Sequence, residues 1–238
     1  MKTMTWDHVR DLAFLNTDAL EGPPRGVVLN FHGYTDDTMF SQSDDFARRL
    51  GERGILYIWP YYSVWAWMSR SAIAYIEELL DLVWEHFGLD GKTPVVYSGG
   101  SMGGMTALMM SLIGKRRPIA CACNCPATDL AWRFERHDSR RAVTSAMILD
   151  EGTPQEWISL RSPQERAADL PHIPYYLLYA ADDTAILPRE RVAFLTAMAD
   201  AGQSVETVLI PGMAHCDLTS HPQAEADYQA FILRQFSR

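Results

Sequence analysis

Six short apolar runs alternate with longer segments of mixed polarity along the chain. The runs are rich in Val, Ile, Leu and Tyr, as buried strands are, and they cover residues 26–31, 55–59, 94–98, 119–124, 175–180 and 205–210. Helical patterns cover residues 40–53, 72–87, 103–114, 189–201 and 224–236. Near-continuous apolar strands that alternate with helices are typical of a parallel sheet covered on both faces. The pattern therefore predicts an α/β fold with a mostly parallel central sheet.

Residues 129–172 depart from this alternation. The segment is charged, has few strand signals, and contains Arg133, Arg136, Arg140 and Arg141. A structureless loop of this length is uncommon in a compact domain, so we expect short helices that form a lid. Two interpretations of the arginines stay open, a solvated helix face and recognition of an anionic group on a substrate. With this insertion, residues 1–238 are expected to form a single domain.

The charge balance narrows the choice of partners. The chain has 238 residues and a formal net charge of −9, which argues against nucleic acid or an anionic membrane as the main partner. The first residues lack the apolar core of a secretory signal, so we expect a cytoplasmic protein. The uncharged run over 93–114 contains five glycines and a proline and divides into a strand and a helix rather than spanning a membrane. A homodimer is left open, as are an edge strand or a packing helix in residues 1–20.

The four cysteines do not suggest a metal site. Cys121, Cys123 and Cys125 alternate along one expected strand, where we expect Cys123 to face away from the other two, and Cys216 lies far away in sequence. No spacing matches a zinc site, so no metal is expected. We expect reduced, buried thiols, with partial reactivity as the alternative for Cys216.

Ser101 stands at the centre of a glycine-rich turn. The turn reads Gly-Gly-Ser-Met-Gly over residues 99–103, with a β-prone apolar run before it and a helix-prone run after it. A strand, a tight turn and a helix with serine at the apex form a nucleophile elbow. The serine there has a strained backbone that lifts its hydroxyl clear of the sheet. The pattern predicts a nucleophilic Ser101; a flexible glycine-rich loop is the alternative.

A serine nucleophile needs a base, and the base needs an acid that orients it. Two adjacent aspartates, Asp182 and Asp183, follow the strand expected over 175–180, and His215 follows the last expected strand. Only one of two adjacent side chains can face the histidine. We favour Asp183 as the acid and keep Asp182 as the alternative, with His215 as the base.

Two backbone N–H groups would have to stabilise the oxyanion. Met102 follows the candidate nucleophile directly and supplies one N–H group. The loop after the first strong strand reads Phe-His-Gly-Tyr over residues 31–34, and Tyr34 supplies the other. His32 in this loop is interpreted as a structural residue that braces it, not as a catalytic base.

These motifs resemble those of the α/β-hydrolases, above all the prolyl oligopeptidase-type and small esterase-type members. The resemblance covers roughly residues 24–238 and rests on the segments 31–34, 99–103, 161–163, 180–183 and 212–215, which occur in the family's order. It implies an α/β-hydrolase fold, a Ser101–His215–Asp183 triad and no cofactor. Ala180 departs from the glycine that the family often has at the acid turn.

An aromatic cluster after the second strand suggests where substrate binds. Trp65, Trp67 and Tyr61 belong to this cluster and would form an apolar wall for an acyl or aromatic group; core and lid packing is the alternative. The predicted function is a serine hydrolase, a carboxylesterase that cleaves small-molecule esters through an acyl-enzyme. An oligopeptidase-like exopeptidase or aminoacyl hydrolase is the first alternative, and a non-catalytic ligand-binding protein of the same fold is the second.

Overall fold

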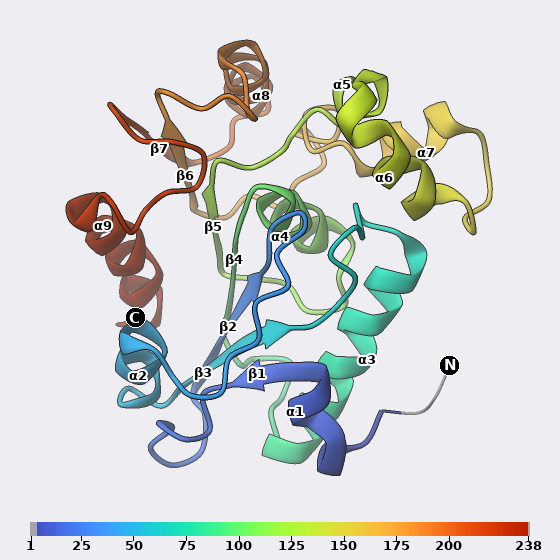
Figure 1. The fold of residues 1–238 in the computed structure, drawn as a ribbon. Coiled ribbons are helices and arrows are strands. Elements are labelled where there is room, and N and C mark those ends of the chain that lie inside the picture. The colour runs from blue at the N-terminus through green and yellow to red at the C-terminus, as the bar shows by residue number, and fades with distance from the viewer. Residues whose placement is uncertain (1–3, 238) are drawn as a thin grey trace.

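In the computed structural model, a seven-stranded sheet forms the centre of the molecule (Figure 1). The structure describes residues 4–237, except for the side chains of residues 137 and 138. The strand order is β1-β3-β2-β4-β5-β6-β7; β1 is antiparallel to β3, and all other neighbours are parallel. The strands are β1 (Ala13–Leu15), β2 (Gly26–Phe31), β3 (Ile55–Pro60), β4 (Val95–Gly100), β5 (Ala120–Asn124), β6 (Tyr175–Ala180) and β7 (Val205–Ile210). The predicted mostly parallel sheet is confirmed.

Apolar residues in the strands explain why the sheet is buried at its centre. β5 and β6 are buried at every position, whereas β7 at the edge is partly exposed along its length. Each of the six predicted strands is present, with ends within two residues of the predicted ones. The seventh strand, β1, lies at the other edge and follows the short helices η1 (Trp6–His8) and α1 (Val9–Leu12). Both structures left open for the first residues therefore occur.

Helices cover both faces of the sheet, as the alternation predicts. In Figure 1, α2 (Asp45–Gly51) and α9 (Pro222–Arg234) lie on one side, and α3 (Arg70–Phe87) and α4 (Met102–Ile113) on the other. α8 (Pro188–Asp200) connects β6 with β7, and η2 (Gln235–Ser237) follows α9. The helix predicted over 40–53 is shorter than expected, because Asp44 caps α2 by accepting a hydrogen bond of 2.7 Å from Ala47 N.

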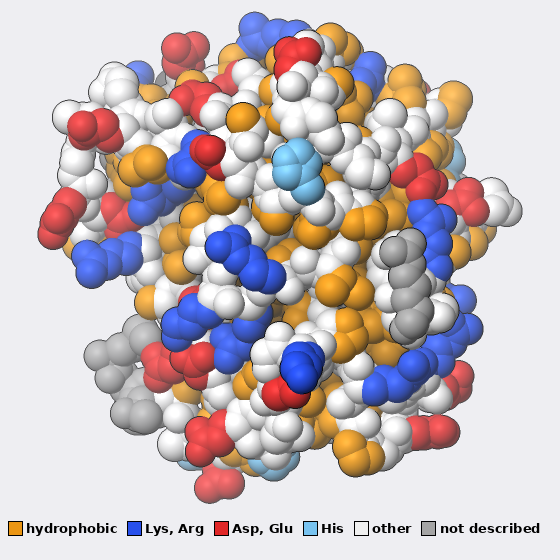
Figure 2. Space-filling view, turned by 180° about the vertical axis from the view of Figure 1, so that it is seen from behind, with side chains coloured by type: hydrophobic (Ala, Val, Ile, Leu, Met, Phe, Trp, Pro, Cys, Tyr) orange, Lys and Arg blue, Asp and Glu red, His pale blue; other side chains and the backbone are white. Residues whose placement is uncertain are grey.

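The surface seen from behind is mixed in character. Figure 2 shows acidic and basic side chains interspersed on this face, with hydrophobic side chains between them. Among residues 4–237, no helix combines the length and the apolarity needed to cross a bilayer.

The insertion between β5 and β6 forms the short helices that its sequence predicts. They are α5 (Leu130–Glu135), α6 (His137–Met147) and α7 (Pro154–Arg161). α7 begins with a capping box between Thr153 and Glu156, a reciprocal pair of hydrogen bonds that satisfies backbone donors at a helix start. In Figure 1 the three helices stand together beyond one end of the sheet.

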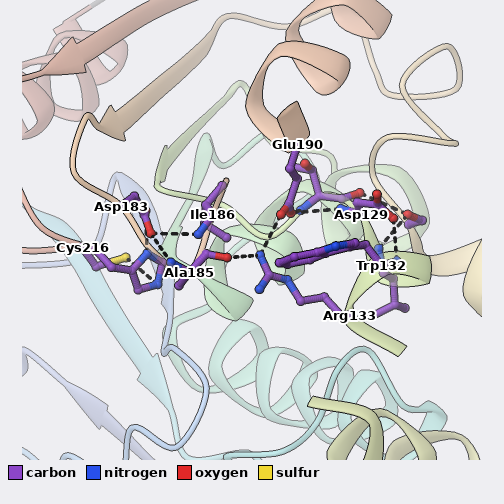
Figure 3. Close-up of polar contacts among 12 residues, drawn as sticks. Asp129, Trp132, Arg133, Asp183, Ala185, Ile186, Glu190 and Cys216 are labelled. Atoms are coloured by element: carbon purple, nitrogen blue, oxygen red, sulfur yellow. Dashed lines mark hydrogen bonds and ion pairs between the residues drawn. The ribbon is translucent and has the colours of Figure 1, made fainter. Parts of the chain in front are cut away.

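A buried ion pair ties the insertion to the rest of the domain. Arg133 in α5 is 6% exposed and Glu190 in α8 is 3% exposed, and Arg133 Nη2 lies 2.7 Å from Glu190 Oε2. Arg133 also donates to the backbone oxygen of Ala185 at 2.7 Å, and Glu190 accepts from Thr128 N at 2.7 Å (Figure 3). A solvated helix face is therefore the wrong interpretation for Arg133, although Arg140 and Arg141 are exposed.

Glu190→Ala should destabilise the protein by about 3–5 kcal/mol, because it leaves the Arg133 guanidinium buried without its counter-ion. Urea denaturation at neutral pH measures this loss. Asp169→Ala is the matched control, since Asp169 pairs with Arg166 at the same 2.7 Å on the surface and should cost at most about 1 kcal/mol. Equal losses in the two variants would contradict the anchoring role of the buried pair.

Candidate active site

Ser101 occupies a strained turn between β4 and α4. Its backbone angles are φ 55° and ψ −120°, a combination that non-glycine residues adopt only where the surrounding structure imposes it. The turn is held by Ser101 N, which donates to Asn124 O at 3.0 Å, and by Ser101 O, which accepts from Met105 N at 3.1 Å. The side chain consequently sits at the N-terminus of α4, on the wall of a cavity.

The glycines around Ser101 are required by close packing. A Cβ atom on Gly103 would lie 2.0 Å from Phe31 O, and one on Gly99 would lie 2.5 Å from Gly103 O. Neither position accepts a side chain without displacing backbone. The start of α4 is thus pressed against the end of β2, which brings the turn next to the loop that contains Tyr34.

Asp183 and His215 meet at the ends of β6 and β7. His215 Nδ1 lies 2.7 Å from Asp183 Oδ2, while Asp183 Oδ1 accepts hydrogen bonds of 2.8 Å from Ala185 N and Ile186 N (Figure 3). Asp183 is buried, whereas Asp182 is exposed. Of the two adjacent aspartates, the structure therefore brings Asp183 to the histidine.

Burial and hydrogen bonds set the charges of this pair. Burial alone raises the pKa of Asp183, but hydrogen bonds from His215 and from the two backbone N–H groups outweigh it and hold the pKa below its ordinary value. Burial lowers the pKa of His215, yet the hydrogen bond with Asp183 and a contact with Cys125 raise it to about 9. Asp183 is thus a carboxylate that favours the protonated imidazole, as an orienting acid does.

The imidazole and the hydroxyl share one cavity. Ser101 and His215 both line it, and the Ser101 hydroxyl makes no hydrogen bond with any residue in the described part of the chain. The other ring nitrogen, His215 Nε2, lies 3.7 Å from Cys216 Sγ. Catalytic hydrogen bonds are often loose without substrate and tighten when it binds, so this arrangement is compatible with transfer of the Ser101 proton to His215.

Two backbone donors point to an oxyanion site. The N–H groups of Tyr34 and Met102 have no acceptor among the described residues, and Tyr34 lines the same cavity as Ser101. A Cβ atom on Gly33 would lie 3.8 Å from Ser101 Cβ, which shows how close the two loops run. His32 braces this region, because its ring stacks on Tyr62 at 4.0 Å and its Nε2 lies 3.0 Å from Tyr62 O.

The cavity has a volume of about 480 Å³. Its apolar wall includes Trp59, Trp67 and Phe31, and Arg133 and Arg136 of the insertion also line it. That volume suits a small ligand with a few polar groups to orient it.

Two of the three aromatic residues expected at this wall lie elsewhere. Trp67 is there, but Trp65 is 53% exposed and lines a separate hollow next to Leu149. The Tyr61 hydroxyl oxygen instead accepts a hydrogen bond of 3.2 Å from Phe40 N. Neither Trp65 nor Tyr61 lines this cavity; of the three residues, the structure brings Trp67 to the expected wall, and their role in substrate binding stays a prediction.

A family model described as the alpha/beta hydrolase fold matches residues 61–219. The chain belongs to the α/β-hydrolase family. The matched stretch contains the Ser101 turn, Asp183 and His215, so the resemblance seen in the motifs is confirmed. No curated protein sequence matches the chain.

Solved structures of esterases and peptidases share this α/β-hydrolase fold. Esterase B from Lactobacillus rhamnosis has a TM-score of 0.68 at 16% identity, over 92% of this chain and 77% of that one. A thermophilic esterase from Thermogutta terrifontis has a TM-score of 0.65 at 19% identity, over 94% of this chain and 85% of the esterase. The acylaminoacyl peptidase of Pyrococcus horikoshii has a TM-score of 0.73 at 15% identity, over 92% of this chain and 38% of the peptidase. This chain therefore spans about two fifths of that peptidase's length.

The cysteines of this α/β-hydrolase are arranged differently from the expectation. Cys121 and Cys123 have sulfur atoms 3.7 Å apart, because residues two apart in a strand share a face; the expected opposite orientation is wrong. Cys125 lies beyond the end of β5, with φ 46°, and it joins Cys216 next to His215. The spacing in the sequence did not predict that Cys125 and Cys216 lie close together, since the two cysteines follow different strands. Their positions after strand ends were the signal that could have found it.

The raised pKa of His215 predicts how activity depends on pH. A base must be unprotonated to accept a proton, so kcat/KM should be full above the pKa of His215 and fall about tenfold per pH unit below it. Because that pKa is raised, the inflection should lie above the ordinary histidine value of 6.5. The measurement is hydrolysis of a neutral ester from about pH 5 to about pH 10.

Two aspartate variants test the cause of this shift. Asp183→Asn should lower the inflection and reduce kcat by about 10⁴-fold. Asp182→Asn is the matched control and should change neither quantity, since Asp182 is exposed. An inflection at or below 6.5 in the unmodified protein would contradict the assignment of His215 as a base coupled to Asp183.

Proposed function

We propose that this α/β-hydrolase is a serine carboxylesterase that acts on small-molecule esters. The observation that carries the proposal is the Asp183–His215 hydrogen bond of 2.7 Å, made on the cavity whose wall also holds Ser101 in its strained turn. A nucleophile, a base and an orienting acid are the three roles that acyl transfer requires. The proposed chemistry draws on these side chains and on water.

In the proposed mechanism, Ser101 Oγ attacks the ester carbonyl while its proton passes to His215 Nε2. Asp183 keeps the proton on Nδ1 and stabilises the imidazolium that forms. The N–H groups of Tyr34 and Met102 donate to the oxyanion, a contribution of about 3–4 kcal/mol for a single donor in comparable sites. The alcohol leaves with the proton from His215, and the acyl group stays on Ser101.

Water then cleaves the acyl-enzyme. His215 Nε2 takes a proton from the water molecule, whose oxygen attacks the acyl carbonyl in the same oxyanion site. Collapse of this second intermediate returns the proton to Ser101 Oγ and releases the acid. The cavity of about 480 Å³ favours small acyl and alcohol groups over long chains.

Removal of the nucleophile tests this proposal directly. Ser101→Ala should reduce kcat on p-nitrophenyl acetate by at least about 10⁴-fold, because the nucleophile and its base act as a unit. A fluorophosphonate should add one covalent label to the unmodified chain, at Ser101, as mass spectrometry of the digested protein would show. Ser111→Ala is the control, since Ser111 donates to Ala107 O inside α4 and should leave the labelling intact. Near-normal turnover of Ser101→Ala would refute the proposal. So would an absence of labelling in the unmodified chain, which would favour a non-catalytic, ligand-binding role instead.

A second candidate function is hydrolysis of aminoacyl esters or amides. The position of Asp36 on the cavity wall favours it, because a carboxylate there can bind the amino group of such a substrate. Asp36 also accepts a hydrogen bond from Thr38 N at 3.0 Å, which gives it a structural role in the loop as well. Asp44 and Asp45 do not line this cavity: Asp44 caps α2, and Asp45 lies within that helix.

Asp36→Asn separates the two candidates because it removes the charge and retains an acceptor for Thr38 N. For an esterase of neutral substrates, kcat/KM on p-nitrophenyl acetate and on an aminoacyl p-nitroanilide should change by less than about twofold. For an aminoacyl hydrolase, the aminoacyl substrate should lose at least about tenfold in kcat/KM while the acetate ester is unaffected. Comparable rates on the two substrates in the unmodified protein would overturn the preference for esters.

A further inference from the structure

Two cysteines lie near the ring nitrogen of His215 that is not hydrogen-bonded to Asp183. The sulfur atoms of Cys125 and Cys216 and a ring nitrogen of His215 all lie within 4.8 Å of one another. His215 Nδ1 is held by Asp183, and His215 Nε2 lies 3.7 Å from Cys216 Sγ. Nε2 is therefore the nitrogen that faces the two sulfur atoms. The serine mechanism proposed above uses neither cysteine.

The distances suit tetrahedral coordination of a soft metal ion. Zinc binds cysteine sulfur at about 2.3 Å and histidine nitrogen at about 2.05 Å, which places nitrogen and sulfur about 3.6 Å apart in a tetrahedral site. The observed distance between His215 Nε2 and Cys216 Sγ is 3.7 Å. Two sulfur ligands would stand about 3.8 Å apart. The ligand atoms lie within 4.8 Å of one another, so a side-chain rotation that moves one sulfur atom by at most about 1 Å would complete the site.

The hydrogen bond between Asp183 and His215 and the backbone conformations of the two cysteines also favour a metal site. Histidines that bind metals commonly donate their second ring N–H to a carboxylate, which fixes the tautomer and strengthens the ligand. Asp183 does this at Nδ1, at 2.7 Å. Cys125 and Cys216 also have left-handed backbones, with φ of 46° and 58°, a strained conformation that concentrates at functional sites.

An ion can reach this place from the cavity. Cys216 and His215 line the cavity together with Ser101, while Cys125 is fully buried behind them. Three protein ligands leave the fourth position of a tetrahedral ion open, for water or another small ligand. Two thiols and an imidazole select Zn²⁺ or a similar thiophilic ion over Mg²⁺ and Ca²⁺, which prefer oxygen ligands.

We propose that Cys125, His215 and Cys216 bind a thiophilic divalent cation such as Zn²⁺, and that the bound ion inhibits the hydrolase by taking the lone pair of His215 Nε2. The ion binds two thiolates and a neutral imidazole, so the protons that the two sulfur atoms and His215 Nε2 carry pass to solvent as two metal–sulfur bonds and one metal–nitrogen bond form. With its lone pair donated to the metal, His215 cannot accept the proton of Ser101. The inhibitory half of this inference rests on the proposed serine mechanism; the binding half does not.

Binding is tested first in the Ser101→Ala variant, so that catalysis plays no part. Zn²⁺ is titrated into the full chain, kept reduced by a phosphine, and followed by isothermal calorimetry. One ion should bind per chain, and Cys125→Ser and Cys216→Ser should each weaken the binding by at least about tenfold. With Co²⁺ as the probe, the sulfur-to-metal absorption band in the near ultraviolet should appear and should weaken in both cysteine variants.

Cys123→Ser is the matched control, because Cys123 is equally buried but donates to Gly104 O at 3.6 Å away from this group. It should bind Zn²⁺ as the parent does. Thermal unfolding checks that each variant is folded, and Cys125→Ala replaces Cys125→Ser if that variant is not. Absence of stoichiometric binding, or binding that neither the Cys125 nor the Cys216 variant weakens, would overturn the site.

Inhibition is then measured as ester hydrolysis with and without Zn²⁺, relative to each variant's own metal-free rate. Saturating Zn²⁺ should reduce the rate of the unmodified chain by at least about tenfold, and a chelator should restore it. The Cys216→Ser variant should resist the same Zn²⁺ concentration. Binding of one ion without loss of rate would refute the inhibitory role. If the metal-free chain hydrolyses no ester, the proposed function fails, while the titration of Ser101→Ala still decides the metal site.

Discussion

The close approach of α4 to the end of β2 is the constraint on which the candidate site depends. Gly103 has no room for a side chain against Phe31 O, where a Cβ atom would lie at 2.0 Å. This contact holds the turn so tightly that Ser101 is left at φ 55°. The same contact brings the start of α4 beside the loop with Tyr34, and Tyr34 and Ser101 line one cavity. Packing of the α4 backbone against the β2 backbone thus fixes the conformation of the Ser101 turn.

Electrostatics at this site depend on burial combined with specific partners. Asp183 is buried, yet three hydrogen bonds keep it ionised, and its charge in turn raises the pKa of His215. The same imidazole lies beside the sulfur atoms of Cys125 and Cys216. The proposed serine mechanism and the proposed metal site both use His215 Nε2, so under these proposals the two uses exclude each other.

The insertion completes the cavity and is held by charge rather than by apolar contact alone. The Arg133–Glu190 pair joins α5 to α8, and a second hydrogen bond from Arg133 reaches Ala185 in the loop that begins with Asp183. In Figure 3 this network extends from Cys216 at one end to Asp129 at the other. Hydrogen bonds through Ala185 consequently link the position of Asp183 to the position of the insertion.

The sequence by itself determined the strands from β2 to β7, most of the helices that cover them, the Ser101 turn and the loops that carry Asp183 and His215. These features follow from local periodicity and from glycines at a turn, which act over a few residues. Only the tertiary structure decided that Asp183 rather than Asp182 meets the imidazole, that Trp65 points away from the cavity, and that Cys125 joins Cys216. Such contacts link segments far apart in the chain, and they depend on the twist of the sheet and on the direction of each side chain after a strand ends, which no local pattern specifies.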